Sequence, residues 1–256
     1  MNSTGKEYFR FLLRSFVPAL MLAAGIFHGC DKGVFFRSSP EVTKETILSP
    51  FGGISVNSIF QIELRSDPDF SISLTGPESI LENITFEVVD NELEISDGNS
   101  YQWLPDYPVV RIVITFPDLE RIDLNSAAAI YSPDTLDLAD LMVIAMAQLI
   151  ELDLTVNAGR VYLRTGTDNY GHYTFRGKTE LLELHVFGSS QVWAEELVAG
   201  TARVRNFSIA DCHVYAEDEL RVWLEHYGNI YYYGSPEEVI VESDNSRGKL
   251  IPGELD

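Results

Sequence analysis

Apolar and polar residues alternate along most of the chain after residue 50. From Phe51 to Phe116 the alternating runs are short, and turn signals such as Gly52-Gly53 and Gly76-Pro77 separate them. Alternation with a period of two is typical of β-strands with one buried face, so this part is predicted to form short strands. One helical turn is expected at Glu78–Asn83, directly after Pro77.

From about Leu119 to Gly234 the alternation is organised into a degenerate repeat of about 20 residues. Each copy has an apolar residue, a variable residue and a small or medium residue. This period is too short for a propeller blade or a common helical repeat, and it suits one turn of a β-solenoid, whose coils bury their apolar side chains against each other. The prediction is an all-β fold, a single-stranded right-handed parallel β-helix with coils of about 20 residues. The copies are Ile130-Tyr131-Ser132, Phe175-Arg176-Gly177, Val192-Trp193-Ala194, Val214-Tyr215-Ala216 and Ile230-Tyr231-Tyr232, with a poorer match at Ile150-Glu151-Leu152.

The middle residue of each copy is expected to point outward if the copies lie in register. Such an exposed column, rich in aromatic rings, could stack on sugar rings or contact a protein partner. The alternative is that the rings only stabilise the sheet surface, since aromatic residues have high β-propensity. The column contains Glu151, and its candidate binding residues are Tyr131, Arg176, Trp193, Tyr215 and Tyr231.

The N-terminal segment has the pattern of an export signal. Basic residues at positions 6, 10 and 14 precede the uncharged stretch Phe16–Phe27, which is too short to span a bilayer as a helix. Gly29-Cys30 follows and resembles the lipobox of bacterial lipoproteins, which implies acylation of Cys30; ordinary cleavage nearby or an uncleaved anchor are the alternatives. The expected organisation is a signal peptide at 1–29, a polar tether at 30–49 and one folded domain at 50–256.

Charge narrows the range of partners. The formal net charge is −21, and the leader holds three of the 18 basic residues, so the remainder is more acidic still. Such a surface repels phosphate backbones, so no nucleic-acid partner is expected. Solubility is the simplest explanation of the acidic balance.

Motifs for catalysis or metal binding are not apparent. The two cysteines, Cys30 and Cys212, belong to no Cys/His cluster, and Cys212 lies in a strand-like repeat where a buried thiol is expected. We expect no metal and no cofactor. Carboxylates occur at Asp123, Asp137, Glu151 and Asp153, but the repeat does not bring two of them to one place beside a base, so no catalytic residues are predicted. A polysaccharide lyase or hydrolase built on a β-helix is the enzymatic alternative.

Several stretches resemble the head GIN domain family of autotransporter adhesins, and the chain is identified as a lipoprotein-type member. The resemblance covers about Phe51 to the C-terminus and implies a right-handed parallel β-helix, export, frequent lipid anchoring and no established enzymatic activity. The stretches are Phe51–Val56, Asp90–Ile95, Phe116–Leu119, Phe187–Ser190 and Gly228–Pro236.

Together these features predict a protein held by a lipid in the bacterial outer membrane, facing the periplasm or the surface. It would bind a glycan or a surface protein. The alternative is a structural homo-oligomer that forms a scaffold in the envelope.

Overall fold

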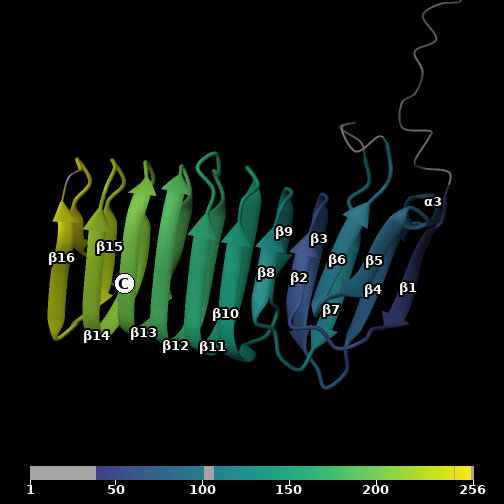
Figure 1. The fold of residues 1–256 in the computed structure, drawn as a ribbon, viewed down its shortest axis with the longest axis horizontal. Coiled ribbons are helices and arrows are strands. Elements are labelled where there is room, and N and C mark those ends of the chain that lie inside the picture. The colour runs from purple at the N-terminus through teal and green to yellow at the C-terminus, as the bar shows by residue number, and fades with distance from the viewer. Residues whose placement is uncertain (1–38, 101–106, 245, 255–256) are drawn as a thin grey trace, which may run out of the picture. The chain divides into compact units, whose positions relative to one another are not determined.

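A computed structural model describes residues 39–100, 107–244 and 246–254, which belong to the compact unit Ser39–Asp256 (Figure 1). The predicted signal peptide, Cys30 and the first part of the predicted tether lie outside the described residues. Among the residues that are described, none of the helices has the length and apolarity needed to cross a membrane.

The unit is built almost entirely of strands. The helical turn predicted after Pro77 is present as α3. The elements are β1 (Glu41–Ile47), β2 (Gly53–Val56), β3 (Phe60–Ser66), β4 (Ser71–Pro77), α3 (Glu78–Leu81), β5 (Ile84–Val89), β6 (Glu92–Asp97), β7 (Arg111–Phe116), β8 (Arg121–Leu124), β9 (Ala128–Tyr131), β10 (Leu136–Ala145), β11 (Ile150–Thr165), β12 (His172–Gly188), β13 (Gln191–Ser208), β14 (Cys212–Leu224), β15 (Ile230–Gly234), β16 (Glu238–Asp244) and β17 (Leu250–Pro252).

The long strands β10 to β14 lie side by side and pair in parallel, each with the next (Figure 1). Successive coils of about 20 residues stack into a β-solenoid of about seven turns, which confirms the predicted fold class. Parallel strands cannot be joined by a tight hairpin, so the chain must travel round a complete coil before it pairs with itself again.

Each of the strands β11 to β14 contributes to two sheets. In β11, Ile150–Asp153 pairs with β9, whereas Val156–Thr165 pairs with β10. We call the sheet that contains β3, β9, the first halves of β11–β14, β15 and β17 the first sheet. The second sheet contains β2, β8, β10, the second halves of β11–β14 and β16. Side chains that point inward from both sheets form the core.

The core is a continuous apolar column. Tyr173, Phe175, Leu182 and Leu184 of β12 are all fully buried, and their neighbours on the adjacent coils are buried as well. Alternation places these side chains inside and sends the intervening residues to the surface, where they form rows along the solenoid. These surface rows are where the chain can meet a partner.

One end of the solenoid departs from the parallel pattern. β1 and β7 both pair antiparallel with β4, and β5 pairs antiparallel with β6. The prediction of a tether over residues 30–49 is therefore wrong for Glu41–Ile47, which form β1. Six of its seven residues are exposed, so β1 lacks the apolar alternation by which a strand is predicted. Its charged side chains suit an edge strand that must not pair with another chain.

Candidate functional site

Three aromatic rings form a stack on the first sheet. The Trp193 and His213 ring centroids are 4.3 Å apart with an interplanar angle of 18°, and those of His213 and Tyr231 are 4.7 Å apart at 8°. The three residues lie in register on β13, β14 and β15. Neighbouring strands are about 4.8 Å apart, so equivalent outward side chains on successive coils stack face to face.

His213 is the central ring, and its partial burial favours the neutral form. Burial lowers the pKa of His213, and the nearby carboxylates of Glu195 and Asp211 offset only part of this effect. His213 Nδ1 lies 2.9 Å from the hydroxyl oxygen of Tyr233. The neutral imidazole therefore acts as a rigid spacer between the indole of Trp193 and the phenol ring of Tyr231.

A bulge in β13 lies directly after Trp193. The register between β13 and β14 shifts between Ala194 and Val198, so the intervening residues have no direct partner on β14. Bulges re-aim side chains and occur next to functional sites. Here the bulge brings Glu195 and Glu196 beside Trp193, and one carboxylate oxygen of Glu195, Oε2, is buried without a hydrogen-bond partner.

Arg176 of β12 borders the same bulge. Its Nε donates to Glu196 Oε2 at 3.0 Å, and its Nη1 pairs with Asp153. Arg176, Trp193, Glu195 and Glu196 surround a shallow hollow of about 230 Å³, together with Thr174 and Phe175. The hollow thus combines the exposed ring of Trp193 with charged groups that can accept and donate hydrogen bonds.

The two faces of the Trp193 indole differ. His213 covers the face toward β14, whereas the neighbour in register on β12 is the small Thr174. The hollow lies on the Thr174 side, and the Trp193 side chain keeps 38% of its surface exposed. One face of the indole is therefore available to a flat ligand, with Arg176 and the two glutamates at its edge.

The predicted column does not lie in one register. Tyr131, Trp193 and Tyr231 do share a row, but Asp153 and Thr174 separate Tyr131 from Trp193. The hydroxyl of Tyr131 donates to Glu63 Oε2 at 2.7 Å, far from the stack along the row.

The other members of the predicted column occupy neighbouring rows. Arg176 pairs in register with Thr155 and Glu196, and Tyr215 with Val198 and Tyr233. Glu151 lies in register with Ala129 and His172. This row is on the other side of the row that contains Tyr131 and Trp193. The placement in a single column is thus wrong, and the binding role of Tyr131, Arg176, Trp193, Tyr215 and Tyr231 stays a prediction.

Sequence reasoning missed His213, Glu195 and Glu196. In the structure Cys212 is in register with Val192 and Ile230, and His213 directly follows it. The repeat copy inferred from the sequence begins two residues later, at Val214. An alignment on Cys212-His213-Val214 would have placed His213 between Trp193 and Tyr231. The glutamates of the bulge give no periodic signal, because they interrupt the repeat.

Three of the four carboxylates considered for catalysis each have a partner of their own. Asp123 pairs with Arg121, Asp137 accepts from Asn157 and Asp153 pairs with Arg176. In residues 39–100, 107–244 and 246–254, no three His, Cys, Asp or Glu side chains are grouped so that they could hold a metal ion.

The fold defines a β-solenoid, and comparison with known proteins identifies the family. Residues 50–236 match the family described as "Putative auto-transporter adhesin, head GIN domain", and the chain belongs to this family. Membership indicates a surface or exported protein of adhesin type. Comparison with curated protein sequences gives no match.

Solved structures show the same fold. A protein described as a putative adhesin from Bacteroides fragilis has a TM-score of 0.75 at 19% identity, covering 84% of this chain and 98% of its own. A second, from Parabacteroides distasonis, has a TM-score of 0.64 at 17% identity, with the same coverage. A P. distasonis protein described as a putative lipid binding protein has a TM-score of 0.54 at 17% identity, covering 85% of this chain and 98% of its own. At these identities the likeness concerns the fold alone.

Proposed function

We propose that this protein is an exported, lipid-anchored protein of the bacterial outer membrane that binds a carbohydrate at the hollow beside Trp193. The observation that carries the proposal is the open indole face of Trp193 next to a bulge with two glutamates and Arg176. No catalytic step is part of this function.

The hollow suits a sugar for two reasons. The C–H face of a pyranose ring is apolar and flat, so it packs against an indole and shields both from water. Sugar hydroxyls both donate and accept hydrogen bonds, and the hollow offers carboxylate acceptors and guanidinium donors at the rim of the ring. The pre-formed stack on His213 holds the indole in place, which reduces the entropy lost on binding.

The test is binding of the purified full chain to an array of neutral and charged glycans. Trp193→Ala should lower the affinity for any bound neutral glycan by about tenfold or more, since an aromatic stacking contact and its hydrophobic burial are lost. Tyr227→Ala is the control, because it removes an exposed aromatic ring in the loop after β14 and should leave this binding unchanged. Binding that persists unchanged in Trp193→Ala, or no glycan bound by the parent chain, would contradict the proposal.

Anchoring through Cys30 is a separate part of the proposal, supported by the lipobox-like Gly29-Cys30. Cells that express the chain should incorporate a fatty-acid analogue into it, and Cys30→Ala should abolish the label and release the protein from the membrane fraction. Cys212→Ala is the control and should label like the parent. A Cys30→Ala chain that still labels would remove this part of the proposal.

A homo-oligomeric scaffold is the second candidate. Strand β16 pairs only with β14 among the described residues, and its Val239 and Val241 are 43% and 48% exposed. An unpaired edge with apolar side chains can pair with a second copy. Size-exclusion chromatography with light scattering distinguishes the two: a stable dimer or trimer that Val241→Lys converts to a monomer favours the scaffold.

A further inference from the structure

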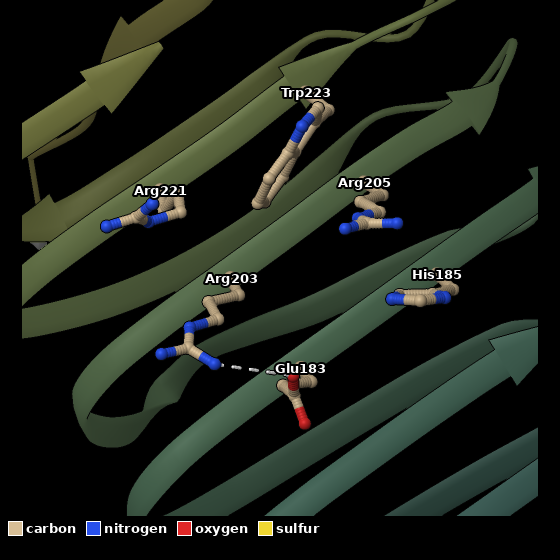
Figure 2. A pocket seen from close by; sticks show the side chains of 6 residues that line it. All are labelled: Glu183, His185, Arg203, Arg205, Arg221 and Trp223. Atoms are coloured by element: carbon tan, nitrogen blue, oxygen red, sulfur yellow. Dashed lines mark ion pairs between the residues drawn. The ribbon is translucent and has the colours of Figure 1, made fainter. Parts of the chain in front are cut away.

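The second sheet carries a concentration of arginine side chains in a chain whose net charge is −21. Arg203 and Arg205 of β13 and Arg221 of β14 line a hollow of about 320 Å³ (Figure 2). Glu183 and His185 of β12 and Trp223 of β14 complete its lining. This hollow is on the opposite sheet from Trp193.

Two rows across the coils build the hollow. One row reads Glu183, Arg203, Arg221 and the other reads His185, Arg205, Trp223, each with one residue per strand. The second row extends backward to Arg164, which pairs in register with His185. Strand spacing therefore places cationic or hydrogen-bonding groups at intervals of about 4.8 Å along the surface.

Nearby carboxylates neutralise only some of these arginines. Glu183, the single carboxylate of the lining, is shared by Arg160 at 2.6 Å and Arg203 at 3.8 Å. Arg221 pairs with Glu219 of its own strand at 3.1 Å and with Glu242 of β16 at 2.7 Å.

Arg205 is different. Among the described residues it forms no ion pair, and its guanidinium lies over the Trp223 ring, 4.5 Å from the centroid. This cation–π contact orients the guanidinium without cancelling its charge. Arg164, on the other side of His185, also forms no ion pair in the described ranges.

We propose that this hollow binds an acidic saccharide, with one sugar carboxylate held between Arg203 and Arg205 and a neighbouring sugar ring packed against the face of Trp223 that Arg205 leaves open. A guanidinium matches a carboxylate with two parallel hydrogen bonds, which gives both energy and orientation. The neighbour of Trp223 in register on β16 is the small Ser243, so among the described residues no second ring lies in register on that side of the indole.

The charge of the whole chain limits the size of the ligand. A long and densely charged polyanion such as nucleic acid would contact the acidic surface around the hollow and be repelled. A short saccharide with one to three carboxylates fits within the hollow, where three arginines outnumber the single carboxylate of Glu183. The site is independent of the Trp193 hollow and does not rest on the function proposed for it.

The test uses the purified full chain and trigalacturonic acid, measured by calorimetry at low and moderate salt. Its methyl ester is the matched control ligand, since it keeps the sugar rings and removes the charges. We expect binding of the acid, binding of the ester at least about tenfold weaker, and an affinity for the acid that decreases with added salt.

Variants locate the site. Arg205→Gln and Trp223→Ala should each lower the affinity for the acid by about tenfold or more. Arg111→Gln removes the same charge from β7, where Arg111 pairs with Glu41, and should change the affinity less than twofold. Neutral glycans test the Trp193 hollow separately, because they lack the carboxylate that this site needs. Failure of this site and failure of the Trp193 site are therefore separate results.

Three outcomes would overturn the inference. The first is equal binding of the acid and its methyl ester. The second is an affinity for the acid that Arg205→Gln leaves unchanged while circular dichroism shows a native fold. The third is binding only to vesicles that contain phosphatidylglycerol, and not to the saccharide, which would assign the arginines to a lipid head group.

Discussion

The indole of Trp193 lies on the imidazole of His213, with the ring centroids 4.3 Å apart. This contact joins the candidate sugar-binding ring to a titratable group. Protonation of His213 would place a charge in a partly buried position between two aromatic rings. The stability of the first sheet should therefore depend on pH.

The first prediction is that the free energy of unfolding falls as the pH is lowered through about 6.5. Burial lowers the pKa of His213 from its ordinary value of 6.5, and that of His185 is lowered by burial and by Arg205, Arg164 and Arg160, with Glu183 acting in the opposite direction. Between the folded and unfolded pKa values, the unfolded chain binds more protons, so acid favours unfolding.

Urea unfolding at pH values from 7.5 to 5.5 measures this effect. His213→Phe keeps a ring in the stack and removes the titration, so its stability should decline less over this range than that of the parent. His226→Gln, a change at an exposed histidine in the loop after β14, is the control and should follow the parent. Parallel curves for the parent and His213→Phe would contradict the prediction.

The fold could be predicted from the sequence because the signal is spread over many residues. Alternation and a repeat of about 20 residues require that the chain bury one face of each strand against the next coil. The register of the surface rows could not be predicted with the same certainty. A shift of two residues keeps every apolar residue inside, so Val214 and Cys212 are equally good first residues of a copy.

The arginine hollow has a signal in the sequence that lies outside the three-residue repeat. Glu183-Leu184-His185, Arg203-Val204-Arg205 and Arg221-Val222-Trp223 each place two outward residues around a buried one, at spacings close to one coil. A comparison of second halves of the coils would have aligned them. The bulge at Glu195 and the strand Glu41–Ile47 had no such signal, because neither follows the apolar alternation.

A second prediction concerns Gly177, where β12 bends between the two sheets. Its φ of +107° is in a region that side chains disfavour, and an added Cβ would collide with the carbonyl oxygen of Val156. Gly177→Ala should lower the free energy of unfolding by roughly 2–4 kcal/mol, from backbone strain and overpacking together. Urea unfolding measures the loss.

Gly200→Ala is the matched control for this change. Gly200 lies on the neighbouring strand β13 and has no positive φ, and its added Cβ would be 3.1 Å from the Glu180 carbonyl oxygen, a contact that a small shift can relieve. Gly200→Ala should lower the free energy of unfolding by clearly less than Gly177→Ala does. Equal losses in the two variants would show that backbone conformation at Gly177 is not the cause.

A third prediction is that the thiol of Cys212 is unreactive in the folded protein. The side chain is fully buried and in register with Val192 and Ile230, and burial raises the pKa of the thiol, so the reactive thiolate is scarce. The native parent and Cys212→Ala should give the same thiol content with Ellman's reagent. In denaturant the parent should give one thiol more; an extra thiol already present in the native parent would contradict the prediction.

The last prediction concerns Asn169, a fully buried amide at the turn between β11 and β12. Its Nδ2 donates to the carbonyl oxygens of Ala145 and Ala147 at 3.3 and 2.5 Å, and its Oδ1 accepts from the Gly171 amide and the Ser190 hydroxyl at 2.6 and 2.7 Å. One side chain thus satisfies polar groups from three successive coils. Asn169→Ala should lower the free energy of unfolding by roughly 2–4 kcal/mol, because buried groups lose their partners.

Asn157 provides the comparison for Asn169. It is exposed on β11 and donates to Asp137 Oδ1 at 2.8 Å, so water can replace its hydrogen bond, and Asn157→Ala should cost less than about 0.5 kcal/mol. Both losses are measured by urea unfolding, and saccharide binding by the folded Asn169→Ala chain should match the parent. If Asn169→Ala is as stable as Asn157→Ala, the buried amide does not hold the coils together, and the turns must be fixed by the apolar core alone.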